Sequence, residues 1–127
     1  MMTMTELVGY TLSNIKPEIP VIRSHKLDGK IKFPSFFVQP LATQTQVKLS
    51  DEQMRKYNFD VVYLVDTKSM NVQSELDKMS EFMLSNLEWI VDKDGIKRHK
   101  VNDLSVEIQN EDLHISFSVN SRYRQGN

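Results

Sequence analysis

The segment "YNFDVVYLVD", residues 57–66, constrains the fold more than any other part of the chain. Successive side chains of a β-strand point to opposite faces. One face of this strand is apolar throughout and consists of Phe59, Val61, Tyr63 and Val65. Val62 and Leu64 make the centre of the other face apolar as well. In a small domain two helices can cover one face of a sheet, so the second face needs a further element or a neighbouring subunit.

The bulk composition is that of a folded domain without an obvious charged partner. A length of 127 residues suits one domain over residues 1–127. The formal net charge of −1 gives no overall field toward nucleic acid or an anionic membrane. The absence of cysteine excludes disulfides and thiolate metal sites and fits a reducing cytoplasm. We find no signal-peptide pattern and no apolar run near the roughly 20 residues of a membrane span, so we expect a soluble protein without a membrane partner.

Two segments have helical periodicity. Thr3 and Glu6 have the spacing of a capping box, and Pro17 should end the helix that begins there. Asn71 is a suitable cap for a second helix over residues 72–90. The apolar stripe of this second helix consists of Val72, Leu76, Met79, Met83, Leu87 and Ile90, widened by Phe82 and Trp89. At this spacing the methionines and aromatic residues indicate a packed core, not a cofactor box.

The remaining apolar segments favour strands. Asp28 and Gly29 predict a turn between a short strand after Pro20 and a second strand from Ser35, which together would form a hairpin. Pro40 places the second strand at an edge or a bulge. Alternation over residues 104–109 and 113–120, around the turn "NED", predicts another hairpin. We expect the final "RYRQGN" to be loose.

These elements predict an α+β fold, an antiparallel β-sheet with two helices packed on one face, in the order α-β-β-β-α-β-β. The polar segment at residues 42–58 lies between two of the strands. We interpret it as a solvated hairpin tip or loop. The alternative is a projecting arm that becomes ordered against a partner.

The sequence contains no pattern typical of catalysis or metal binding. His25, His99 and His114 are scattered and are interpreted as surface residues. Asp60 and Asp66 would lie roughly 20 Å apart on one strand, too far for a carboxylate pair, and are interpreted as solvated strand ends. The basic stretches at residues 97–100 and 122–124 are interpreted as charged rims. We therefore expect no cofactor, no metal and no enzymatic activity.

The aromatic stretch "FPSFFVQP", residues 33–40, fits the start of a strand. Phe36 and Phe37 are adjacent, so their side chains point to opposite faces. One of them can enter the core under the helices. The other then meets whatever covers the second face, which favours an interface.

Four segments together resemble a known family. They are "KFPSFFVQPL", "YNFDVVYLVD", "ELDKMSEFMLSNLEWI" and "VEIQNEDLHISFSVNSRYR". With the order of the elements, they are similar to the small tail terminator, or tail completion, proteins of long-tailed bacteriophages and related tail-like particles. The resemblance spans nearly the whole chain and consists of structural patterns without catalytic signatures. The fold that it implies is an antiparallel sheet with helices on one side.

The resemblance implies a structural protein of the virion tail or of a tail-like particle, made in the bacterial cytoplasm. It implies a homo-oligomeric ring, typically a hexamer, on the head-proximal end of the tail tube. There the ring would stop tube growth and present a joining surface to the head connector. The implied partners are further copies of the chain, the tail tube protein, and a sheath or head-connector protein. DNA would pass through the ring without a specific nucleic-acid site.

We assign interface residues on this basis. For subunit packing or core we select Phe36, Phe37, Val62 and Leu64. For contacts with neighbouring ring or tube proteins we select residues 42–56, with Lys48 and Arg55, and the terminal Arg122 and Arg124. The rival hypotheses are a generic protein-interaction module, a nucleic-acid-binding module that uses the two basic stretches, and a small enzyme or ligand-binding domain.

Overall fold

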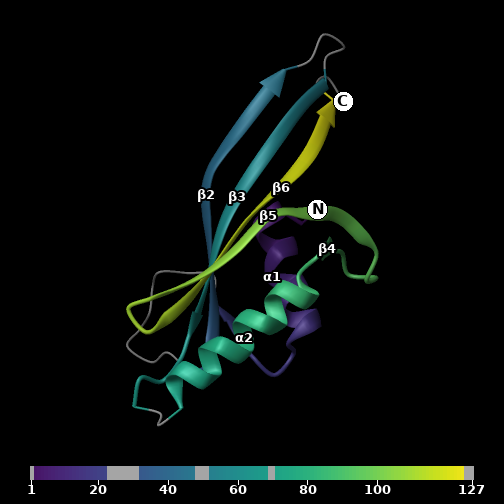
Figure 1. The fold of residues 1–127 in the computed structure, drawn as a ribbon. Helices are drawn as coiled ribbons and strands as arrows, with labels where there is room; N and C mark the ends of the chain where they lie inside the picture. Colours follow the sequence, from purple (N-terminus) through teal and green to yellow (C-terminus); the bar gives the residue numbers. More distant parts are fainter. Residues whose placement is uncertain (1, 23–31, 48–51, 69–70, 125–127) are drawn as a thin grey trace.

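The structure is a computed structural model, and it describes residues 2–22, 32–47, 52–68 and 71–124. The fold is α+β, as predicted, with two helices and one six-stranded sheet (Figure 1). In chain order the elements are α1 (Met4–Ile15), β1 (Val21–Ile22), β2 (Ser35–Val47), β3 (Glu52–Leu64), α2 (Val72–Asn86), β4 (Trp89–Val91), β5 (Lys97–Gln109) and β6 (Asp112–Arg124).

The strand order in the sheet is β1-β2-β3-β6-β5-β4, and all neighbours are antiparallel except β1 and β2. The predicted hairpin of the first two strands is therefore wrong, because Val21 pairs with Phe36 in a parallel register. A parallel pair needs a connection of about a dozen residues, and residues 23–34 provide that length. The turn predicted at Asp28 and Gly29 lies outside the described residues.

Helix α1 begins and ends as predicted. The Thr3 hydroxyl accepts from the Glu6 amide, and the Glu6 carboxylate accepts from the Thr3 amide, which is the capping box. Thr11, on the buried side, links this helix to β4. Its Oγ1 donates to the Leu7 carbonyl at 2.8 Å and accepts from the Val91 amide at 3.0 Å. Helix α1 is thus hydrogen-bonded to β4, the strand at one edge of the sheet.

Helix α2 is shorter than predicted and ends at Asn86. Asn71 occupies the N-cap position, but its side chain does not make the capping hydrogen bond. At the other end the Asn86 amide group donates to the Phe82 carbonyl at 2.8 Å, and the chain then turns into β4. Trp89 and Ile90 therefore lie on a strand, and Ile90 is fully buried opposite His99 of β5.

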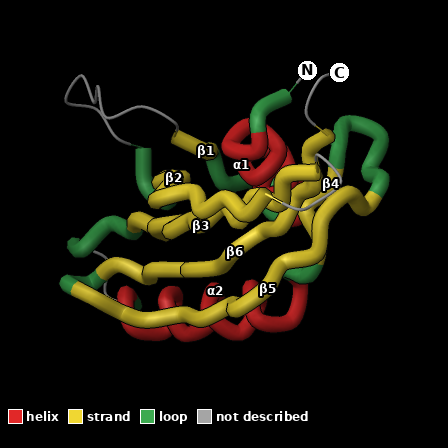
Figure 2. Tube along the Cα trace, turned by 90° about the horizontal axis from the view of Figure 1, so that it is seen from above, coloured by secondary structure: helices red, strands yellow, loops and turns green. Residues whose placement is uncertain are grey.

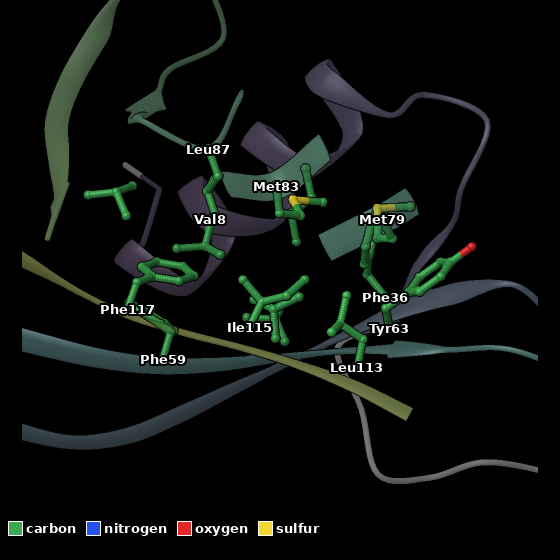
Figure 3. Close-up of a cluster of buried hydrophobic side chains, with 14 of the residues drawn as sticks. Val8, Phe36, Phe59, Tyr63, Met79, Met83, Leu87, Leu113, Ile115 and Phe117 are labelled. Carbon is green, nitrogen blue, oxygen red and sulfur yellow. The ribbon is translucent and has the colours of Figure 1, made fainter. Parts of the chain in front are cut away.

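The core lies between the two helices and one face of the sheet, as predicted (Figure 3). Seen from above, α2 lies along the β5 side of the sheet and α1 lies beside β4 (Figure 2). Phe59 and Phe117 stack with their ring centroids 5.6 Å apart, and Phe36 lies 5.4 Å from Tyr63. Helix residues in the core include Met4, Val8, Leu12, Leu76, Met79 and Met83.

The long strands correct two further predictions. Residues 43–47 and 52–57 are paired strands, so most of the segment expected to be a loop or hairpin tip is regular β-structure. Arg122–Arg124, expected to be loose, form the end of β6 and pair with β3. The upper ends of β2, β3 and β6 extend past both helices (Figure 1). Pro40 lies at a register shift between Pro40 and Thr43, as predicted for a bulge.

Candidate assembly surface

We call the projecting part of the sheet the ribbon. It comprises Thr43–Val47 of β2, residues 52–57 of β3 and residues 119–124 of β6, with β3 in the middle. Residues 43–46 are exposed and residues 52–57 are half-buried. A three-stranded ribbon that few core residues cover is a surface on which a partner can pack.

The helix-side face of the ribbon carries an ordered arginine. Arg55 shares this face with Tyr57, which precedes the core residue Phe59 by two positions. The Arg55 Nε donates to Gln53 Oε1 at 2.7 Å, and its Nη1 donates to the Tyr57 hydroxyl at 3.4 Å. These bonds fix the guanidinium group in one orientation over β3. Beneath it, a cavity of about 370 Å³ separates the ribbon from the N-terminus of α1.

The outer face of the ribbon, which points away from the helices, carries two basic residues around a methionine. Lys56 and Met54 alternate with the helix-side residues of β3, and Arg122 lies directly opposite Met54. The Lys56 ammonium group is 3.8 Å from the Asp103 carboxylate, and both side chains are largely exposed. A groove of about 570 Å³ on this face is lined by Gln44, Thr45, Gln46, Met54, Lys56 and Asn120.

The residues selected for subunit packing differ in how deeply the structure buries them. Phe36 is fully buried in the core, and Val62 is only 6% exposed on the outer face of the sheet. Phe37 and Leu64 are half-buried on that outer face, where Phe37 pairs with Val62. Phe37 and Leu64 are therefore the apolar side chains of this set that a neighbour can still cover.

Three of the four selected basic residues lie on the ribbon. Arg55 and Arg122 are on opposite faces of it, as their positions in β3 and β6 require. Arg124 ends β6, where its backbone pairs with Glu52. Lys48 lies outside the described residues. Arg122 is exposed, whereas Arg55 is half-buried and hydrogen-bonded.

A polar cluster on the outer face was missed by the sequence analysis. Asp60 was expected at a solvated strand end, but it lies within β3 and accepts from Ser116 Oγ at 3.3 Å. His114 was expected to be a surface residue, but its Nδ1 is 2.9 Å from Asp60 Oδ2. The three residues meet because β3 and β6 are paired in this register, and single-strand alternation does not reveal that register.

The turn between β4 and β5 is organised by one carboxylate. Asp92 accepts from the amides of Asp94 and Ile96 and from the Arg98 Nε at 2.7 Å. Desolvation alone would raise the pKa of Asp92, but these hydrogen bonds outweigh it and hold the pKa below its ordinary value. Gly95 has a φ of +74° in this turn, which glycine adopts without a steric cost.

The two basic stretches differ in their surroundings. In the stretch at residues 97–100, Arg98 is paired with Asp92, and His99 is partly buried. Burial lowers the pKa of His99, a hydrogen bond to the Asn120 backbone raises it less, and Arg98 lowers it further. In the stretch at residues 122–124, Arg122 is exposed. The first stretch is therefore largely involved in internal contacts.

The described residues show neither a metal-binding cluster nor a membrane-spanning helix. No group of three or more His, Cys, Asp or Glu side chains there is placed to hold a metal ion. No helix within those segments is both long enough and apolar enough to cross a membrane.

Comparison with known proteins gives one strong result. A family model described as "Phage tail terminator protein" matches residues 4–126, nearly the whole chain. No curated protein matches the sequence. Among the solved structures that match, one aligns with 94% of this chain and 94% of its own, at 13% sequence identity and a TM-score of 0.32.

Proposed function

This chain belongs to the phage tail terminator family, and we propose that it caps the head-proximal end of a tail tube as a closed ring, with six copies as the expected number. Membership of the family makes it a structural component of the phage tail. In the proposed role the ring ends tube polymerisation and presents a joining surface to the head connector.

The ribbon is the observation that supports this proposal. Three strands continue past the helices, and apart from the buried Val119 their described side chains are mostly polar and exposed or half-buried. Extended β-structure of this kind adds little to the core of its own chain. It is suited to contact with neighbouring proteins, because main-chain and side-chain polar groups along it remain accessible.

A ring ends growth by covering the surface on which the next layer of tube subunits would add. Such a ring requires heterologous contacts, in which one patch of a subunit meets a different patch of the next and the rotation closes. Phe37 and Leu64 on the outer face are proposed to pack between subunits. Arg55, Arg122, Arg124 and Lys48 are proposed to contact neighbouring ring or tube proteins.

The decisive experiment is the tail-length distribution, measured by electron microscopy, of particles produced with this gene deleted. We expect overlong or ragged tails without heads, and a single tail length after the protein is supplied from a plasmid. Tails of normal length with normally joined heads in the deletion strain would refute the proposal. A purely catalytic role would leave tail length unaffected, so the deletion experiment distinguishes it from the proposed structural role.

A further inference from the structure

We propose that, in the ring, the outer face of the ribbon of one copy docks on the exposed side of α2 of the next copy. The inference rests on the proposed ring and adds to it the two surfaces that meet.

The ribbon contributes a basic surface with an apolar centre. Lys56 and Arg122 are diagonal neighbours, because Lys56 pairs with Asn120 and Met54 pairs with Arg122. Diagonal neighbours on paired antiparallel strands lie about 7–8 Å apart. Met54 is half-buried between them. The Lys56 contact with Asp103 is long and exposed, so breaking it costs little.

Helix α2 contributes the complementary surface. Asp77, Glu81 and Leu84 follow one another at helical spacing and are exposed, opposite the buried Leu76 and Met83. Leu84 is 49% exposed. Asp77 accepts from Gln73, but among the described residues neither Asp77 nor Glu81 forms an ion pair. Like charges one turn apart repel. The exposed Lys78 lies on the same side of α2 and also forms no ion pair among the described residues, so Asp77, Lys78 and Glu81 together keep one net negative charge that a basic partner would offset.

The two surfaces match in pattern and in size. Each has two like charges beside one apolar side chain: Lys56 and Arg122 beside Met54, and Asp77 and Glu81 beside Leu84. The carboxylates one turn apart have Cβ atoms about 5–6 Å from each other, and the basic residues are about 7–8 Å apart, so the long side chains of Lys56 and Arg122 can reach both. A helix of 15 residues is about 22 Å long, and six residues of strand in the ribbon span about 20 Å.

The orientation of the two surfaces favours a ring over a two-fold dimer. The ribbon surface lies on the outer side of the sheet, and the α2 surface lies on the far side of the helix layer. One chain therefore cannot join its own two surfaces, because the sheet and the core lie between them. Contact between copies is front to back, which is the heterologous type that closes into rings or continues as filaments.

Disulfide crosslinking tests this contact directly, because the chain has no cysteine of its own. The double variant Arg122→Cys with Glu81→Cys is produced in the deletion strain, and the assembled particles are oxidised. We expect a ladder of covalent multimers up to the full ring on non-reducing gels. Each single variant should give dimers at most. The matched control pairs Arg122→Cys with Glu107→Cys, which is exposed on the outer face of β5, the face opposite the helices, and should give no ladder.

Two outcomes would refute the contact: a ladder from the control pair alone, or no ladder in particles with normal tail length. Neither outcome would contradict the proposed ring. Where the cysteine variants fail to assemble, exchanged charges provide the test. Arg122→Glu alone should reduce the fraction of terminated tails at least about tenfold, equivalent to about 1.4 kcal/mol. Arg122→Glu with Glu81→Arg should restore it. Absence of restoration would refute the contact, whereas normal tails in the deletion strain would refute the ring itself.

Discussion

At the scale of single residues, Thr11 is a buried polar side chain whose hydroxyl forms two hydrogen bonds. The residue is 1% exposed, and its hydroxyl donates to the Leu7 carbonyl and accepts from the Val91 amide. Thr11→Val keeps the shape but leaves the Val91 amide without this partner, so we expect a loss of about 1–3 kcal/mol in the free energy of unfolding. Urea unfolding measures the change, and Ser13→Ala on the exposed side of α1 is the control. Equal midpoints for the two variants would contradict the assigned role.

His99 predicts a dependence of stability on pH. Its pKa in the folded protein is below the ordinary 6.5, mainly through burial, so the unfolded chain binds the proton more readily. The contribution of His99 to the free energy of unfolding is fully present above pH 6.5. It is lost as the pH falls through the pKa of His99 in the folded protein. The stability that Asp92 contributes is lost only at a lower pH, because its pKa in the folded protein is held below 3.8.

The measurement is the urea midpoint of the wild type and of His99→Gln at several pH values. We expect the wild type to lose stability relative to the variant as the pH falls below about 6.5. Parallel curves for the two proteins would show that burial of His99 does not disfavour its protonation.

At the scale of elements, α2 has one face in the core and one face outside. Met83 is fully buried and Leu84, the next residue, is 49% exposed. We expect Met83→Ala to cost about 2–5 kcal/mol through the cavity it leaves. Leu84→Ala should change the free energy of unfolding by less than about 0.5 kcal/mol and weaken assembly instead. Denaturation midpoints and tail-length distributions of the two variants test this division. A large stability loss for Leu84→Ala would contradict it.

The outer face of β3 allows a similar pair of substitutions. Val62 is buried, and its cross-strand neighbour His114 already contacts Asp60, so Val62→Asp adds a second carboxylate to this face and should cost more than about 3 kcal/mol. Leu64 is half-buried, so Leu64→Asp should spare the fold and impair tail termination. Circular dichroism and tail length distinguish the two outcomes. Normal termination with Leu64→Asp would remove this residue from the proposed interface.

The sequence predicted those elements whose residues have a burial pattern. Helix α1, with its capping box, and the β5–β6 hairpin were recognised because alternation or helical spacing reflects contact with one core. The strand β4 was missed, since Leu87 and Ile90 continue the helical stripe although the helix has ended. A short apolar run does not distinguish the end of a helix from a strand.

The ribbon could not be predicted from such a pattern. Residues 43–46 are all exposed, so no apolar alternation marks them as a strand. Their β-structure comes from pairing with β3, which in turn pairs with β6. The candidate site depends on the same long-range register. Arg122 was selected from the sequence as a terminal basic residue, but its place beside Lys56 and Met54 follows only from the pairing of β3 with β6.

At the scale of the whole molecule, the formal net charge of −1 conceals a separation of charge. The outer face of the ribbon carries Lys56 and Arg122, with Asp103 beside Lys56, whereas the exposed side of α2 carries Asp77 and Glu81 with Lys78 between them. The core that holds the chain together is apolar. Salt should therefore act differently on the fold of one copy and on the proposed contact between copies, because screening weakens exposed ion pairs and leaves apolar burial almost unchanged.

We expect the ring to dissociate more readily as the salt concentration rises from about 0.05 M to about 1 M, where the screening length falls from above 10 Å to about 3 Å. The urea midpoint of the monomer should change little over the same range. Sedimentation velocity of the purified ring, or of rings released from tails, gives the fraction assembled at each salt concentration. Arg122→Glu with Glu81→Arg should retain this salt dependence, since the exchange preserves the ion pair. A ring that becomes more stable in high salt would show that apolar burial at Phe37 and Leu64, and not the ribbon charges, dominates the contact between subunits.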